Sequence, residues 1–234
     1  MSNEEPLLHL SVGLVLFPNL TQLDLTGPYE VFARMPNTSV YLLADTLEPI
    51  RSEGGLTINP DTHFDSVPPL DILFVPGGVG INPMMEDENF LNFLREQGQQ
   101  AKYVTAVCTG ALLLAAAGLL QGYRATTHWL SMEFLTMLGV QPVSERVVID
   151  RNRITAGGIT AGIDFGLVVA SELFGQTVAQ EIQLMLEYDP QPPFHSGSPK
   201  SADAVVVESV TIARQGIQDT RREIVKRVAA RLFT

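Results

Sequence analysis

The sequence has very little cysteine: among its 234 residues only Cys108 carries a thiol. A single cysteine cannot form a disulfide within the chain and cannot build a cysteine-based metal cluster. Histidine is also scarce, and the four histidines include no pair spaced i, i+4 that would bind zinc from one helix face. These absences exclude an internal disulfide and argue against a metal centre.

Basic residues and long apolar runs are scarce as well. The chain has 15 Lys and Arg against 26 Asp and Glu, which gives a net charge of −11. Such a surface repels nucleic acid and anionic lipid, so neither is an expected partner. Residues 1–6 lack the pattern of a secretory signal, and the apolar run 111–120 is too short to span a membrane. We therefore expect a cytoplasmic enzyme or binding protein.

What the chain does have is a regular alternation of strand-like and helix-like segments. The expected strands, most of them apolar throughout, are 10–17, 39–44, 71–76, 103–107, 124–128, 147–149 and 154–156, with a short hairpin at 51–60. The expected helices are 26–33, 89–100, 111–117, 132–138, 162–174 and 178–188. This alternation predicts an α/β fold in which helices cover both faces of a mostly parallel sheet.

Several turns that follow the predicted strands carry polar residues or glycines. They contain Asp24, Gly77-Gly78, Cys108 and Gly157-Gly158-Ile159. Because parallel sheets place their chemistry at the carboxyl ends of the strands, we expect these residues to meet at one edge. The glycine-rich turn at 157–162 lacks the spacing of a dinucleotide-binding loop.

Cys108 lies where an apolar strand passes into a helix. The free N–H groups and positive dipole of a helix start favour an anion, so the position predicts a nucleophilic thiol with a lowered pKa. The alternative is a small apolar side chain in the core, which is the usual state of a lone cysteine. We favour the nucleophile because of the strand-to-helix turn.

Asp24 is the leading candidate for an acid beside that thiol. Its flanking leucines would raise its pKa if it were buried, so it could hold a proton and deliver it to a reacting group. An N-cap role before Thr26-Gly27-Pro28 is the alternative. The N–H groups of Gly77, Gly78 and Thr109 could bind developing negative charge. His128 and Trp129 are more weakly indicated, as pocket or packing residues.

The C-terminal part reads as a proline-rich segment, 189–199, followed by a helix over 202–232. An apolar face marked by Val206, Val210, Ala213, Ile217, Ile224, Val228 and Leu232 runs along this helix. The face could pack on its own domain or help form a dimer, and both alternatives stay open. We expect residues 1–234 to form one domain, with 190–234 packed on the body or in a dimer interface.

Five segments together resemble the ThiJ/PfpI superfamily and, within it, the branch of isocyanide (isonitrile) hydratases. They are Gln22–Pro28, Val75–Gly78, Val107–Gly110, Ala125–Trp129 and Gly157–Asp164, so the resemblance covers essentially the whole chain. It implies a flavodoxin-like three-layer sandwich with a cysteine nucleophile elbow, a homodimer, and no cofactor or metal.

The resemblance also implies roles for single residues. Cys108 would be the nucleophile, Asp24 its acidic partner, and Thr109 a contributor through its N–H and hydroxyl, with Ile159 beside the thiol. The substrates would be an isocyanide and water, joined through a cysteine thioimidate into a formamide. Many members of the superfamily have a histidine after the cysteine, where this chain has Thr109, which disfavours protease-like Cys-His chemistry.

Two other functions remain open on the same resemblance. Ligand-sensing domains of AraC-type regulators carry similar segments, although only some 35 residues follow the proline-rich stretch here, too few for the DNA-binding module of those regulators. A glyoxalase-like or stress-response protein with a reactive cysteine is the third alternative.

Overall fold

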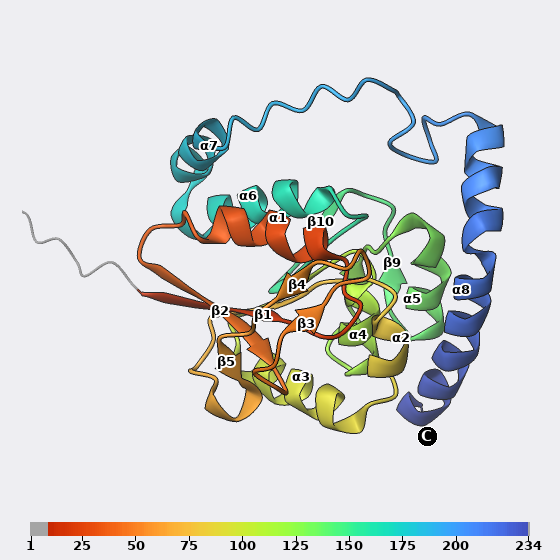
Figure 1. The fold of residues 1–234 in the computed structure, drawn as a ribbon, viewed down its shortest axis with the longest axis horizontal. Helices are drawn as coiled ribbons and strands as arrows, with labels where there is room; N and C mark the ends of the chain where they lie inside the picture. Colours follow the sequence, from red (N-terminus) through yellow and green to blue (C-terminus); the bar gives the residue numbers. More distant parts are fainter. Residues whose placement is uncertain (1–8, 234) are drawn as a thin grey trace, which may run out of the picture.

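The computed structural model describes residues 9–233 and builds them around a seven-stranded sheet with helices on both faces (Figure 1). In spatial order the strands are β10 (Val147–Asp150), β11 (Arg153–Ala156), β7 (Tyr103–Val107), β6 (Ile72–Val75), β1 (Leu10–Val15), β2 (Thr38–Ala44) and β5 (Thr62–His63). Every neighbouring pair is parallel except β10 with β11. The predicted mostly parallel sheet is confirmed.

Helices cover both faces of the sheet and pack on it through buried aromatic rings. Helices α1 (Gln22–Phe32) and α6 (Ala161–Phe174) cover one face, and α3 (Glu88–Gln100) and α4 (Gly110–Ala116) cover the other (Figure 1). Phe32 of α1 packs edge-on against Phe74 of β6 and Phe165 of α6, at 6.1 and 5.9 Å between ring centroids. All three rings are buried, and each contributes roughly 1.5–3 kcal/mol of apolar burial.

Smaller elements complete the body. The hairpin expected at 51–60 is confirmed as β3 with β4, and β8 pairs with β9. These elements are β3 (Ile50–Arg51), β4 (Thr57–Ile58), β8 (Arg124–Ala125), β9 (Gln141–Pro142), α2 (Ile81–Met84), α5 (Met132–Met137) and α7 (Gln176–Met185), with 3₁₀ turns at Phe64–Ser66 and Trp129–Ser131.

Several predicted boundaries are wrong, and two of them have a clear physical reason. The first helix begins at Gln22 and not at Thr26, because Thr21 takes the N-cap position and its carbonyl accepts from the Asp24 N–H. Pro28 therefore lies inside the helix, where the prediction placed it in the first turn. The strand expected at 124–128 ends at Ala125, since the Thr126 N–H donates to the Thr155 side chain and leaves the strand ladder.

The C-terminal helix α8 (Ala204–Leu232) follows residues 186–203, which form neither helix nor strand, and lies beside α5 and α2 (Figure 1). Its second half packs on the body, where Ile224, Val225 and Val228 are buried. Its first half does not: Val206 and Val210, part of the predicted apolar face, are 44% and 40% exposed. No helix in the described part of the chain is long and apolar enough to cross a membrane.

Candidate active site

Cys108 occupies a sharp turn between β7 and α4, as the sequence predicts. Its backbone is left-handed, with φ of 56°, which is costly for a residue with a side chain, about 1–3 kcal/mol. Hydrogen bonds hold the turn: the Cys108 N–H donates to the carbonyls of Ala156 and Gly157 at 3.0 and 2.8 Å. The Thr127 hydroxyl donates to the Cys108 carbonyl at 2.8 Å. The fold thus imposes a strained elbow on this residue alone at the end of β7.

Asp24 lies next to the thiol and is completely buried. Its Oδ2 accepts from the Gly77 N–H at 3.0 Å, and its carboxyl and the Cys108 thiol are close enough to shift each other's pKa. Oδ1 has no hydrogen-bond partner among the described residues. Burial raises the pKa of Asp24 from 3.8 to about 7, against the smaller lowering effects of the Cys108 thiol and the Gly77 N–H. The alternative N-cap role is wrong, because Thr21 is the N-cap.

The pKa of the Cys108 thiol does not follow the sequence-based expectation. Burial raises this pKa well above its ordinary range, and the neighbouring Asp24 carboxylate raises it further. The Thr109 N–H at the start of α4 lowers it, as does the Arg221 guanidinium, but these effects are smaller. The helix start therefore acts on the thiol as predicted, while desolvation outweighs it. Cys108 and Asp24 thus both bind their protons more tightly than in water, and each affects the other's titration.

Thr109 and the two glycines surround Cys108 and Asp24. The Thr109 hydroxyl is bound to the Gly78 backbone, accepting from its N–H at 3.1 Å, so only the Thr109 N–H interacts with the thiol. The Gly77 N–H is engaged by Asp24. Both glycine N–H groups thus have protein acceptors here, and their binding of a substrate oxygen stays a prediction. Gly78, at φ of +128°, has a backbone that disfavours any side chain.

A cavity of about 80 Å³ opens beside the thiol. Cys108, Thr109, Gly78 and Ile159 line it, which brings together four of the six residues singled out from the sequence. Asp24 and Gly77 lie behind them, with no exposed surface on Asp24. Ile159 is 37% exposed on the turn before α6 and forms part of the cavity wall.

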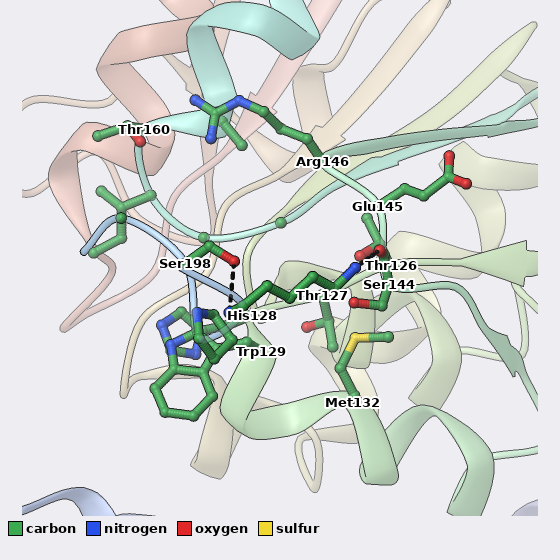
Figure 2. A pocket seen from close by; sticks show the side chains of 17 residues that line it. Thr126, Thr127, His128, Trp129, Met132, Ser144, Glu145, Arg146, Thr160 and Ser198 are labelled. Atoms are coloured by element: carbon green, nitrogen blue, oxygen red, sulfur yellow. Dashed lines mark hydrogen bonds between the residues drawn. The ribbon is translucent and has the colours of Figure 1, made fainter. Parts of the chain in front are cut away.

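His128 lines both this cavity and a larger one of about 430 Å³, whose lining side chains are drawn in Figure 2. Trp129 and Met132 line the larger cavity, and Ile159 lines both. Burial, together with the positive charges of Arg221 and Arg214, lowers the pKa of His128 to about 4, so the imidazole is neutral near pH 7. A neutral wall residue fits the limited role that the sequence indicates for His128.

The sequence did not point to the residues that α8 adds to the small cavity, Ile217, Gln218, Arg214 and Arg221. A signal for the last of them exists. Arg221 falls within the apolar face of α8, between Ile217 and Ile224, and a charged residue in a buried stripe usually has a specific partner. Glu53, from the β3–β4 hairpin, also lines the cavity and was not predicted.

No group of three or more His, Cys, Asp or Glu side chains is arranged to hold a metal ion within residues 9–233. The reactive groups of this site are the Cys108 thiol, in the wall of a small, partly apolar cavity, and the buried Asp24 carboxyl beside it. This set can attack an electrophilic carbon with sulfur and move a proton at the same place.

Comparisons with known proteins agree with this arrangement. The chain is 52% identical to the isonitrile hydratase of Pseudomonas putida, over 95% of this chain and 98% of that protein. It is 32% identical to the HTH-type transcriptional regulator GbdR of Pseudomonas aeruginosa, over 76% of this chain and 51% of the regulator.

Solved structures show the same fold. A ThiJ/PfpI family protein from Pseudomonas syringae superposes with a TM-score of 0.91 at 39% identity, over 96% of this chain and 97% of that one. Drosophila melanogaster DJ-1beta gives 0.71 at 26% identity, over 78% of this chain and all of its own. The DJ-1/PfpI family model matches residues 10–172, which contain the elbow and its carboxyl partner. The chain belongs to the DJ-1/PfpI family.

Proposed function

We propose that this protein hydrates isocyanides to N-substituted formamides, with Cys108 as nucleophile and Asp24 as proton carrier. The observation that carries the proposal is the buried thiol–carboxyl couple at the wall of a small cavity. Similarity to an isonitrile hydratase over 95% of the chain supports the same reaction. The proposed hydration uses only these two side chains and water, without a cofactor.

The first step adds the thiol to the terminal carbon of the isocyanide. A sulfur lone pair forms the C–S bond, and the lone pair on the same carbon takes the proton that Cys108 and Asp24 share. The product is a thioimidate, R–N=CH–S, on Cys108. A couple with one shared proton suits this step, because the substrate needs a nucleophile and an acid at one atom.

The second step uses Asp24 as the base, now a carboxylate. Water adds to the thioimidate carbon, one of its protons passes through Asp24 to the nitrogen, and a tetrahedral intermediate forms. The intermediate collapses: its hydroxyl proton returns to the Cys108–Asp24 couple, the C–S bond breaks, and the formamide leaves. The site returns to its starting state with one shared proton, so atoms and charges balance.

Product analysis with two substrates tests this function. The purified protein is incubated separately with an alkyl isocyanide and with methylglyoxal, and formamide and lactate are measured. We expect formamide only. Lactate without formamide would instead support the glyoxalase-like alternative, and neither product, combined with ligand-dependent stabilisation, would support a sensor.

The sensor alternative is less well supported than the enzyme. The regulator match extends over only 51% of that protein. The net charge of −11 also opposes DNA binding. The hydratase proposal accounts for the chain over almost its full length.

Gly77 is expected to be essential for the placement of Asp24. A Cβ at this position would lie 2.6 Å from the Thr109 nitrogen and 2.8 Å from Asp24 Oδ2, so both groups must move. We expect Gly77→Ala to lower kcat roughly 10²-fold, because small displacements of reacting groups are that costly. Gly216→Ala is the control, since nothing lies within 4 Å of its Cβ. Equal kcat in the two variants would contradict this placement.

We also propose that the protein is a homodimer that uses the exposed half of α8. Val205 and Ile212 are 76% and 63% exposed there, on a helix whose other half packs on the body. Ile212→Lys should shift the mass measured by light scattering from that of a dimer to that of a monomer. Gln215→Lys, about one helical turn further along α8, adds the same charge without removing an apolar side chain and should not. An unchanged dimer in Ile212→Lys would exclude this surface.

The remaining proposals concern the chain as a whole. We propose that it acts as one α/β unit, because α8 both packs on the body and lines the cavity of Cys108. We also propose a cytoplasmic location, where the reducing conditions would keep the single thiol of Cys108 reduced.

A further inference from the structure

Arg221 of α8 is a buried cation without a carboxylate partner. Only 3% of its surface is exposed. Its Nε donates to Asn82 Oδ1 at 2.9 Å and its Nη1 to Ser131 Oγ at 3.0 Å, and both partners are neutral. Nη2 has no acceptor, and no carboxylate lies within ion-pair distance, among the residues that the structure describes. A buried guanidinium in such surroundings is costly, so its placement calls for an explanation.

The position of Arg221 relative to Cys108 explains why a guanidinium is buried here. The α8 residues that line the small cavity are Arg214, Ile217, Gln218 and Arg221. Their spacing, i, i+3, i+4 and i+7, puts them on one face of the helix, and that face closes the cavity opposite the thiol's turn. The Arg221 side chain is thus held in the wall of the space in which Cys108 reacts.

The other charges around the thiol come from separate elements. Asp24 of α1 and Glu53 of the β3–β4 hairpin are acidic, Arg214 is basic, and His128 is neutral near pH 7. Arg221 and the Cys108 thiolate stabilise each other's charged forms. Burial lowers the pKa of Arg221 to about 10, which leaves it charged at neutral pH. Arg221 is therefore positively charged at neutral pH in the wall of the cavity that Cys108 also lines.

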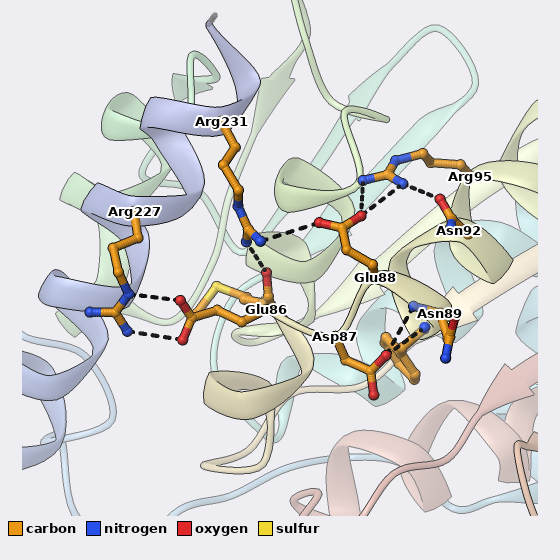
Figure 3. A network of polar contacts seen from close by, with 10 residues as sticks. Glu86, Asp87, Glu88, Asn89, Asn92, Arg95, Arg227 and Arg231 are labelled. Carbon is orange, nitrogen blue, oxygen red and sulfur yellow. Dashed lines mark hydrogen bonds and ion pairs between the residues drawn. The ribbon is translucent and has the colours of Figure 1, made fainter.

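Ion pairs fix α8, and with it Arg221, on the body (Figure 3). Arg227 makes two hydrogen bonds to Glu86, at 2.7 and 2.9 Å, and Arg231 pairs with Glu88 at 3.3 Å. These contacts join the last turns of α8 to Glu86, which lies between α2 and α3, and to Glu88, the first residue of α3. Both ion pairs lie one to three helical turns beyond Arg221, and they fix the position of α8 on the body.

We propose that Arg221 is a positioning residue that stabilises the Cys108 thiolate, both when it attacks and when it leaves. A fixed cation favours the state in which the shared proton sits on Asp24 and the sulfur carries the charge. It acts again at the collapse of the tetrahedral intermediate, where the C–S bond breaks with its electrons on sulfur. The role in turnover rests on the proposed hydration, whereas the charge effect on the thiol does not.

Alkylation of the only cysteine tests the charge effect without an isocyanide. The rates with neutral iodoacetamide and anionic iodoacetate are measured between pH 6 and 10. We expect Arg221→Gln to slow iodoacetamide about tenfold near neutral pH, the effect of raising the thiol's pKa by about one. Iodoacetate should slow further, because the cavity loses a cation. Arg221→Lys should restore both rates in large part.

The matched control is Lys226→Gln, which removes from the same helix an exposed cation that lies outside the cavity and pairs with Glu223 of α8 itself, and which should leave both rates unchanged. Arg221→Gln rates equal to wild type, or Arg221→Lys as slow as Arg221→Gln with both reagents, would overturn the proposal. Wild-type protein gives a second test that needs no variant to fold: its iodoacetate-to-iodoacetamide ratio should exceed that of glutathione. A ratio at or below that of glutathione also overturns it.

Discussion

Replacement of Cys108 by alanine is expected to abolish formamide production, with a loss of roughly 10⁴-fold or more in kcat. The variant keeps the cavity and Asp24 but has no atom that can form the thioimidate. Cys108→Ser should be almost as inactive, because its hydroxyl must lose a proton of much higher pKa in the same buried place. Turnover is followed with p-nitrophenyl isocyanide in purified protein.

The fold should survive both substitutions, which keeps the result interpretable. The elbow is held by backbone contacts of residue 108, the N–H to Ala156 and Gly157 and the carbonyl to Thr127, and these remain in the variants. Thermal unfolding within a few degrees of wild type is the control. Full hydration by Cys108→Ala would rule out covalent catalysis at this residue.

Replacement of Asp24 by asparagine should have the second largest effect, about 10²–10⁴-fold on kcat. Asparagine is close to the same shape and can still accept from the Gly77 N–H, but it cannot give a proton to carbon or take one from water. We expect both steps to slow, so little thioimidate should accumulate. An Asp24→Asn variant with near wild-type kcat would contradict the assignment of Asp24 as proton carrier.

The same substitution should stabilise the protein at alkaline pH. Burial raises the folded-state pKa of Asp24 from 3.8 to about 7, so the folded state binds the proton more tightly than the unfolded state does. The resulting stabilisation is complete below about pH 4 and is lost as the pH rises through about 7. At pH 8 the wild type must bury a carboxylate, which costs on the order of a few kcal/mol. Asparagine stays neutral, so the gain in melting temperature of Asp24→Asn over wild type should be larger at pH 8 than at pH 5.

The sheet and the elbow could be predicted because each depends on local pattern. Apolar strands such as Ile72–Val75 are buried on both faces in a parallel sheet, and a strand that runs straight into an alanine- and leucine-rich helix must turn at Cys108. Asp24, Gly77 and Cys108 meet because they follow neighbouring parallel strands, β1, β6 and β7. The proximity of Asp24 to Cys108 could therefore be predicted from the expected order of the parallel strands.

The remaining features depend on tertiary contacts that no local pattern encodes. The pKa of the Cys108 thiol is set mainly by burial, which outweighs the effect of the helix start. Arg221 reaches the cavity from a helix 113 residues further along the chain, outside the matched family region of 10–172. The sequence predicted that Arg221 lies on the C-terminal helix, but it did not predict that this part of the helix lies against the cavity of Cys108. The start of α1 was misplaced because Pro28 fits inside the helix.

The most direct test is mass spectrometry of the intact protein, quenched with acid during turnover of p-nitrophenyl isocyanide. The account predicts a species heavier than the free protein by the mass of one substrate, with fragments that place the adduct on Cys108. The adduct should disappear once substrate is exhausted and should be absent from Cys108→Ala. Formamide production at full rate with no adduct on Cys108, or with the adduct on another side chain, would contradict it.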